Sequence, residues 1–241
     1  MYQVLGIKAL LKVFGLGCLL IFILILLGYA YFQPSALAGL GAYWRAASVS
    51  VSIVSAAIVI CGETPVFPWA CRRIPFIRGY FPPIEGLWKV TVKSNWGAIQ
   101  RLMGNNDIEP LISKAGTIRI TSRFFRVRLV FQSDDKYSSS HSVCVSVQRD
   151  PEHGTTQLNY IYHNKTLVPE ATDASSHNGA ARVNIQDDGD VVTLEGVYFT
   201  DRKWTEGLNT AGLIRFEGMT LRSAYHRLPE QCARHHHDKH Q

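Results

Sequence analysis

The sequence predicts a membrane α-helical hairpin of two transmembrane helices, followed by a small eight-stranded antiparallel up-and-down β-barrel. Residues 13–32 carry no charge, and about twenty such residues are long enough to cross a bilayer core of roughly 30 Å. After Pro83, apolar and polar residues alternate in eight short runs, as they do in half-buried strands. At 241 residues, the chain leaves room for one soluble domain beside the helices.

A second uncharged segment, residues 46–61, follows the first at once. Its small residues suit close packing between helices in lipid, and its serines can bond to carbonyls of their own helix. Basic residues flank the pair of segments, with Lys8 and Lys12 before it and Arg72, Arg73 and Arg78 after it. Because such flanks stay in the cytoplasm, we expect both chain ends and the barrel there. A cleaved signal peptide, with its cleavage site at residues 36–38, is the alternative.

The chain divides into four expected parts: the two-helix hairpin over residues 1–62, a proline-rich linker over 63–83, the barrel over 84–221, and a polar, histidine-rich tail over 222–241. The five prolines of the linker break helices and favour extended structure. No helix is expected within the barrel. Each expected strand alternates about apolar residues near these positions: 84–92, 118–120, 127–131, 143–147, 158–162, 181–185, 192–198 and 213–215.

The connections between the expected strands differ in length. Those after the first, third, fifth and seventh strands are long, and they cover residues 95–116, 133–140, 163–178 and 202–210. Successive strands of an up-and-down barrel run in opposite directions, so the long connections gather at one end. Because long loops on a rigid scaffold commonly carry binding residues, we expect a ligand site at that end, facing the cytosol.

The opposite end is expected to be closed by a tryptophan and an arginine. Trp88 lies near the start of the first strand and Arg215 near the close of the last, so the guanidinium should cover the indole ring. The Gly86-x-Trp88 pattern with a late arginine resembles the lipocalins. We expect this pair to close the barrel rather than to bind ligand.

Polar and aromatic residues gather where the strands meet the long connections. The candidate ligand contacts are Ser138, Tyr160, Tyr162, Asn164, His177, Tyr198, Thr200 and Arg202. Arginine and hydroxyl groups suit phosphate oxygens, and flat rings suit bases. Other roles stay open: the serine-rich stretch as a solvated loop, Tyr160 and Tyr198 as core residues with satisfied hydroxyls, and Arg202 as an ion-pair partner of Asp201 or Glu206.

Other classes of function find little support in the sequence. There is no nucleophile elbow, glycine-rich phosphate loop or spaced carboxylate pair, so we expect no enzyme, no cofactor and no metal site. The five cysteines are widely spaced and favour a reducing compartment over a disulfide framework. The net charge of +6 is spread along the chain, and no DNA or RNA partner is expected.

The order of these features resembles a family of bacterial CBASS antiphage effectors with two transmembrane helices and a minimal β-barrel. The features are the two apolar segments, the proline-rich linker, the Gly-x-Trp strand, the serine-rich hairpin, the Tyr-x-Tyr-x-Asn strand, the His-x-Gly strand opening and the Gly-x-Tyr-x-Thr-x-Arg strand. The resemblance covers all but the last twenty or so residues. It implies that Tyr198, Thr200 and Arg202 are the foremost ligand contacts.

The resemblance also implies a function in antiviral defence. The barrel would bind a cyclic dinucleotide or a related cyclic oligonucleotide made by a partner nucleotidyltransferase of the CD-NTase type. The protein would then form homo-oligomers in the lipid bilayer and disrupt the bacterial inner membrane. Two alternatives remain: a related, decoy-type defence in which bound nucleotide holds the effector silent, and a secreted lipocalin-like carrier of an apolar ligand.

Overall fold

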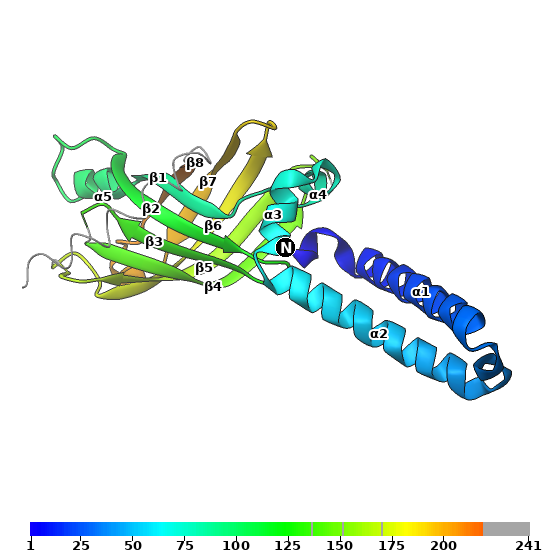
Figure 1. Ribbon diagram of the computed structural model, residues 1–241. Coiled ribbons are helices and arrows are strands. Elements are labelled where there is room, and N and C mark those ends of the chain that lie inside the picture. Colours follow the sequence, from blue (N-terminus) through cyan, green and yellow to red (C-terminus); the bar gives the residue numbers. More distant parts are fainter. Residues whose placement is uncertain (136, 151, 170, 219–241) are drawn as a thin grey trace, which may run out of the picture. The chain divides into compact units, whose positions relative to one another are not determined.

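The computed structural model describes residues 1–135, 137–150, 152–169 and 171–218 (Figure 1). The chain separates into two compact units. The helical unit contains Met1–Phe81 and Arg123–Arg126, and the barrel unit contains Pro82–Ser122 and the residues from Val127 onward. The expected tail over 222–241 lies outside the described residues.

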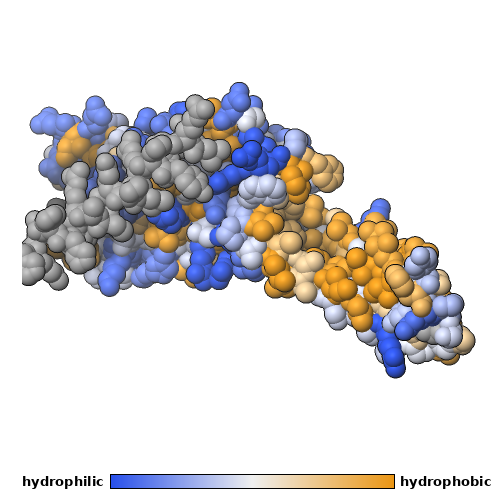
Figure 2. All heavy atoms as spheres, viewed as in Figure 1, coloured by the Kyte–Doolittle hydropathy of each residue, from blue (hydrophilic) through white to orange (hydrophobic). Residues whose placement is uncertain are grey.

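Two long apolar helices dominate the helical unit. α1 (Gly6–Phe32) and α2 (Leu40–Glu63) are about 40 and 36 Å long at 1.5 Å per residue, more than the roughly 30 Å of a bilayer core. The short helices η1 (Tyr2–Val4) and η2 (Pro34–Ala38) precede them. No residue of α1 is buried, and Figure 2 shows apolar side chains gathered over this part of the chain. Both helices are long and apolar enough to cross a membrane, as the sequence predicts.

Small residues allow close helix packing, and two serine hydroxyls of α2 bond within their own helix. A Cβ added at Gly17 of α1 would lie 3.5 Å from Val54 of α2, so the two helices approach closely there. The hydroxyl of Ser50 donates to the carbonyl of Ala47 at 2.8 Å, and Ser52 donates to the carbonyl one turn earlier at 2.9 Å. These hydroxyls are satisfied within α2, so its serines are compatible with a membrane span.

The expectation of an extended linker is wrong. Residues 66–80 form two short helices, α3 (Val66–Arg73) and α4 (Pro75–Tyr80). Pro68 falls in the first turn of α3, and Pro75 occupies the first position of α4. The first turn of a helix has no intrahelical partner for its N–H groups, so proline is tolerated there and even favours a helix start.

Residues 123–126 complete the helical unit through an aromatic cluster. The ring of Phe124 lies 5.5 Å from that of Phe67 and 5.9 Å from that of Phe81, in edge-to-face arrangements. The N–H of Phe124 also donates to the carbonyl of Gly62 at 2.9 Å. Aromatic pairs of this geometry contribute beyond the area that they bury, so this turn is firmly part of the unit.

The barrel unit is a closed antiparallel barrel of eight strands that pair in sequence order, with β8 paired back to β1. The strands are β1 (Gly86–Ser94), β2 (Ile112–Ser122), β3 (Val127–Ser133), β4 (Ser138–Arg149), β5 (Thr156–Thr166), β6 (Ser176–Asp187), β7 (Val192–Thr200) and β8 (Ala211–Gly218). The predicted fold class, two apolar helices followed by this barrel, is confirmed.

Apolar side chains fill the end of the barrel at which β1 begins, called here the closed end. They are buried, and they include Ile84, Trp88, Val90, Ile120, Leu158, Val183, Leu194 and Phe216. The other end, at which β1, β3, β5 and β7 finish, is called the open end. The core therefore occupies one end and leaves the other available for a ligand.

Trp88 closes the barrel without Arg215, which corrects the expected pairing. Trp88 is 5% exposed, its Nε1 donates to the carbonyl of Ile84 at 2.9 Å, and its ring packs on Gly218. Arg215 pairs instead with Thr91 across the β1–β8 ladder and points outward, with its Nε 3.0 Å from a carboxylate oxygen of Glu195. In β8 the residues that alternate with Arg215 point into the barrel, and Arg215 points out of it.

The links at the open end differ from expectation in three of the four cases. The β3–β4 link spans only residues 134–137, because β4 begins at Ser138. The β1–β2 link contains a helix, α5 (Trp96–Leu102), where none was expected. Its second residue is a glycine, and a Cβ there would collide with the carbonyl oxygen of Glu109. The β7–β8 link contains the short helix η3 (Trp204–Glu206).

A bulge in β4 turns a row of serines toward the barrel interior. The register against β5 shifts between Ser142 and Cys144, and Val143 is 67% exposed, contrary to the expected alternation. The hydroxyl of Ser142 accepts the N–H of Leu129 on β3 at 2.9 Å, as a side-chain bond between the two strands. As a result Ser138, Ser139 and Ser140 belong to a strand, whereas Asp134 and Asp135 of the same stretch lie in the hairpin link.

Candidate ligand-binding cavity

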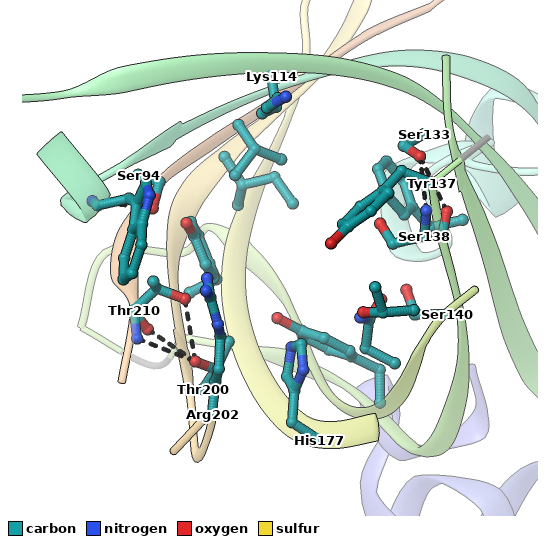
Figure 3. A pocket seen from close by; sticks show the side chains of 18 of the residues that line it. Ser94, Lys114, Ser133, Tyr137, Ser138, Ser140, His177, Thr200, Arg202 and Thr210 are labelled. Carbon is teal, nitrogen blue, oxygen red and sulfur yellow. Dashed lines mark hydrogen bonds between the residues drawn. The ribbon is translucent and has the colours of Figure 1, made fainter. Parts of the chain in front are cut away.

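A cavity of about 460 Å³ occupies the open half of the barrel, and every strand contributes to its wall (Figure 3). All eight predicted ligand contacts line it: Ser138, Tyr160, Tyr162, Asn164, His177, Tyr198, Thr200 and Arg202. The structure thus brings together side chains that lie up to 64 positions apart in the sequence. Their role as contacts to a ligand stays a prediction.

Strand register places the tyrosines in two neighbouring rows across β5, β6 and β7. One row runs Tyr162, Gly179, Thr200, and the next runs Tyr160, Ala181, Tyr198. The rings of Tyr160 and Tyr162 lie 5.9 Å apart with a tilt of 43°. Small residues on β6 separate the large ones on its neighbours, so the rings have space inside the barrel.

Gly179 is required by the position of the Tyr162 ring. A Cβ at Gly179 would lie 2.3 Å from Cζ of Tyr162, closer than real atoms approach. The ring therefore lies directly over the glycine backbone. Burial raises the pKa of Tyr162 and also that of Tyr160, so both hydroxyls are neutral at physiological pH. A neutral hydroxyl can donate to a phosphate oxygen without adding negative charge to the cavity.

Thr200 holds the ends of β7 and β8 together. Its hydroxyl accepts the N–H of Thr210 at 3.1 Å and lies 3.0 Å from the hydroxyl of the same residue. Both threonines are buried. This contact keeps β7 and β8 paired where they leave the barrel, just before Arg202 in the β7–β8 link.

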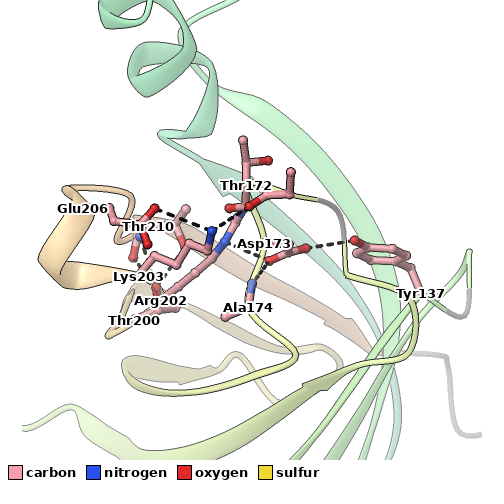
Figure 4. Close-up of polar contacts among 10 residues, drawn as sticks. Tyr137, Thr172, Asp173, Ala174, Thr200, Arg202, Lys203, Glu206 and Thr210 are labelled. Atoms are coloured by element: carbon pink, nitrogen blue, oxygen red, sulfur yellow. Dashed lines mark hydrogen bonds and ion pairs between the residues drawn. The ribbon is translucent and has the colours of Figure 1, made fainter.

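Arg202 is held inside the cavity by Asp173 and Thr172, whose contacts Figure 4 shows, and by the ring of Trp96. Its Nε lies 2.9 Å from a carboxylate oxygen of Asp173, and Nη2 donates to the carbonyl of Thr172 at 2.9 Å. The guanidinium carbon lies 4.4 Å above the ring of Trp96, a cation–π contact. The arginine side chain is 14% exposed, and neither Asp201 nor Glu206 is its ion-pair partner.

Asp173 connects Arg202 to a second part of the open end. One of its oxygens faces Arg202 and accepts the N–H of Ala174 at 3.0 Å, and the other accepts the hydroxyl of Tyr137 at 3.0 Å. The carboxylate side chain is 13% exposed. The β3–β4, β5–β6 and β7–β8 links are therefore joined through this one carboxylate.

A second cation lines the cavity on β2. The Nζ of Lys114 lies 3.6 Å from a carboxylate oxygen of Asp135, and both side chains are largely exposed at 68% and 49%. A hydrogen bond from Ser133 is the main reason why the pKa of Asp135 is lowered. Exposed pairs of this kind contribute little to stability, so Lys114 can exchange its partner at small cost.

His177 supplies an uncharged nitrogen beside Arg202. Burial lowers the pKa of His177, and the Arg202 guanidinium lowers it further, so the imidazole is neutral at physiological pH. Its Nδ1 is buried and has no hydrogen-bond partner among the residues that the structure describes. A ligand in the cavity can provide that partner.

Several cavity residues were not among the predicted contacts, and those that bear on ligand binding include Trp96, Lys114, Tyr137 and Asp173. Trp96 belongs to a short helix inside a long link, and Tyr137 and Asp173 belong to links, where no periodicity reports the direction of a side chain. Lys114 is followed by Ala-Gly at the start of a strand, so alternation is weak there. For this part of the open end, the one signal in the sequence is that Asp135 lies in a run of polar residues.

Comparison with known proteins points to one family. A family model described as "Cap15, cyclic dinucleotide receptor domain" matches residues 80–218, a range that contains all eight strands. The chain is also similar to "CD-NTase-associated protein 15" of Escherichia albertii, with 26% identity over 172 residues. That similarity covers 70% of this chain and 78% of the relative.

Proposed function

Because the chain belongs to the family of Cap15 cyclic dinucleotide receptor domains, we propose that its barrel binds a cyclic dinucleotide in the cavity at its open end. The observation that carries this proposal is the chemistry of the wall. Arg202 and Lys114 provide two cations, and tyrosine rings provide flat surfaces within the same space of about 460 Å³. A ligand with two phosphates and two bases requires this combination.

Binding moves two phosphate charges from water into the barrel, and the wall must compensate the lost hydration. The guanidinium of Arg202 offers a fork of N–H donors, and neutral hydroxyls of Tyr160, Tyr162 and the β4 serines add further donors. An apolar ligand would leave these groups without partners, at a cost of about 1–3 kcal/mol for each buried one. The alternative function, a lipocalin-like carrier of an apolar ligand, is therefore disfavoured.

The two apolar helices support a further proposal, that ligand binding leads to damage of a membrane. We infer that a partner nucleotidyltransferase makes the ligand during phage infection, and that occupied receptors form homo-oligomers whose α1 and α2 disrupt the inner membrane. The exposed apolar surface of α1 supports placement in lipid, because water-soluble helices bury one face. The protein acts in this proposal as an effector without catalytic activity.

Calorimetric titration of the full chain in detergent micelles tests the binding step. The titrants are cyclic di-AMP, cyclic di-GMP and mixed cyclic dinucleotides that contain cytosine or uracil, with the linear dinucleotides as controls. At least one cyclic dinucleotide should bind, and its linear counterpart should bind more weakly. If no cyclic dinucleotide binds, the proposed function is wrong.

Leakage of dye from vesicles that contain the purified chain tests the membrane step. Addition of the bound cyclic dinucleotide should start leakage, and vesicles without protein should stay intact. Leakage that occurs without ligand and stops on its addition would instead support the alternative in which ligand holds the effector silent.

The basic flanks give a prediction for topology. A reporter fused to the C-terminus should behave as cytoplasmic, and a cysteine introduced at Ser35, in the short link between α1 and α2, should react with a membrane-impermeant reagent from the periplasmic side. A cysteine introduced at Asp190, in the barrel, is the control and should stay protected in intact cells. Labelling of the barrel residue from outside would contradict the cytoplasmic placement.

A further inference from the structure

Among the described residues, the two basic side chains Arg202 and Lys114 that line the cavity are each paired with an acid that also lines it. Arg202 faces Asp173, and Lys114 faces Asp135. The two pairs differ strongly in burial, since the Arg202–Asp173 side chains are 14% and 13% exposed and the Lys114–Asp135 side chains 68% and 49%. A carboxylate is an unexpected wall group for a doubly anionic ligand, because like charges repel most strongly where water is excluded.

Asp173 occupies the side of Arg202 that a phosphate would use. Its inner carboxylate oxygen lies 2.9 Å from Nε as an ion pair, although Nε makes no hydrogen bond to any described residue, and the carbonyl of Thr172 accepts a hydrogen bond from Nη2. The face of the fork against Trp96 is covered by the indole ring. In this arrangement the Asp173 carboxylate lies against Nε and the Thr172 carbonyl engages Nη2, so a phosphate that approaches this side of Arg202 must displace Asp173. The carboxylate therefore stands where a phosphate oxygen would bind.

The position of Asp173 is itself set by its neighbours. Tyr137 donates its hydroxyl to the outer oxygen, and the N–H of Ala174 donates to the inner one. The segment 171–175 that carries Asp173 is also tied to the β7–β8 link, because Nζ of Lys203 donates to the carbonyl of Ala171 at 2.6 Å. These contacts present the carboxylate to Arg202 in the empty barrel.

We propose that Asp173 is an internal competitor for the ligand phosphate, which holds Arg202 in the empty barrel and must leave it when a cyclic dinucleotide binds. This inference rests on the proposed function. This competition lowers the affinity for the ligand, because the Arg202–Asp173 ion pair must be broken before Arg202 can contact a phosphate. The residue thereby sets the ligand concentration at which the receptor becomes occupied, and it rejects ligands that carry too little charge to displace it.

The alternative role for Asp173 is to bind the ligand directly, by accepting hydrogen bonds from donors on one of its bases. The two roles predict opposite signs for one substitution. Asp173→Asn keeps the shape of the side chain and removes its charge, so loss of a competitor should tighten binding, whereas loss of a base acceptor should weaken it.

The test is calorimetric titration of full-length wild type and Asp173→Asn with the same cyclic dinucleotides, in the same micelles. Asp173→Asn should bind about tenfold more tightly, since the ion pair with Arg202 loses its charge attraction and a neutral amide competes less well with a phosphate. Asp173→Glu, which keeps the charge, should stay near the wild-type affinity. Asp173→Ser also removes the charge and gives a second variant with the same expected direction if Asp173→Asn fails to fold.

Two controls separate the competitor from a general effect of charge. Asp190→Asn removes one negative charge from the link at the closed end and should leave the affinity unchanged. Asp135→Asn removes the exposed acid of the second pair and should change the affinity by much less than Asp173→Asn does.

The outcomes distinguish this inference from the proposed function. If wild type binds and both charge-removing variants bind equally or more weakly, Asp173 is not a competitor, while the receptor function stands. Equal tightening by Asp190→Asn would also overturn it, because general charge would then explain the effect. If neither wild type nor any variant binds a cyclic dinucleotide, the proposed function fails and the inference fails with it.

Discussion

Arg202→Ala is expected to bind cyclic dinucleotides about ten- to a hundredfold more weakly than wild type, because the variant loses the charged donor fork of the cavity. Arg202→Lys should recover only part of the affinity, since an ammonium keeps the charge and loses the fork. Calorimetric titration of the full chain measures both. Arg215→Ala is the matched control, because it removes the same charge from the outer face of the barrel.

The structure adds an effect on stability that the sequence did not suggest. The arginine is held by Asp173, Thr172 and Trp96. Its removal leaves the buried carboxylate of Asp173 without its cation, and should lower the free energy of unfolding by about 1–3 kcal/mol. Urea unfolding without ligand measures this. If Arg202→Ala binds as tightly as wild type, the ligand lies elsewhere and the site is wrong.

Trp88→Ala is expected to lower the free energy of unfolding of the barrel by about 3–5 kcal/mol, because it leaves a large cavity in the closed end. The tryptophan is 5% exposed and packs on Gly218, where no side chain is available to fill the space. Urea unfolding followed by far-ultraviolet circular dichroism measures the loss.

Trp88→Phe is the control for this prediction. It keeps most of the apolar volume and loses only the hydrogen bond to the carbonyl of Ile84, so its loss should be clearly smaller. A Trp88→Ala variant that unfolds at the wild-type urea concentration but fails to bind ligand would show that the residue serves binding, and the closed end would need another explanation.

The fold could be predicted from the sequence because both units have strong periodic signals. The continuous apolar run of α1 predicts a helix, and the alternation of β5, β6 and β7 predicts strands. The resemblance to CBASS effectors with a minimal barrel is confirmed by the family match over residues 80–218. The expected gathering of polar residues at one end also follows from strand direction alone, and the structure brings them to one cavity.

The wrong predictions arise where the hydrophobic pattern fits two side-chain arrangements, or where it carries no information about side-chain direction. In β8, Leu213 and Ile214 are both apolar, so alternation could not decide which set faces inward, and Arg215 was assigned to the wrong face. In β4, the bulge at Val143 reverses the order of faces within one strand. Asp173 lies in a link, where the direction of its side chain depends on contacts with residues far along the chain, such as Arg202 and Tyr137.

The closure of the barrel limits how copies of this protein can assemble. Each described strand has a neighbour on both sides, so the barrel offers no free row of backbone N–H and C=O groups to an incoming chain. Assembly by adding strands, as in fibrils, would require the barrel to open and its cavity to be lost. Copies that associate with ligand bound must therefore meet through side chains or through the apolar helices, and such an assembly can come apart again without unfolding.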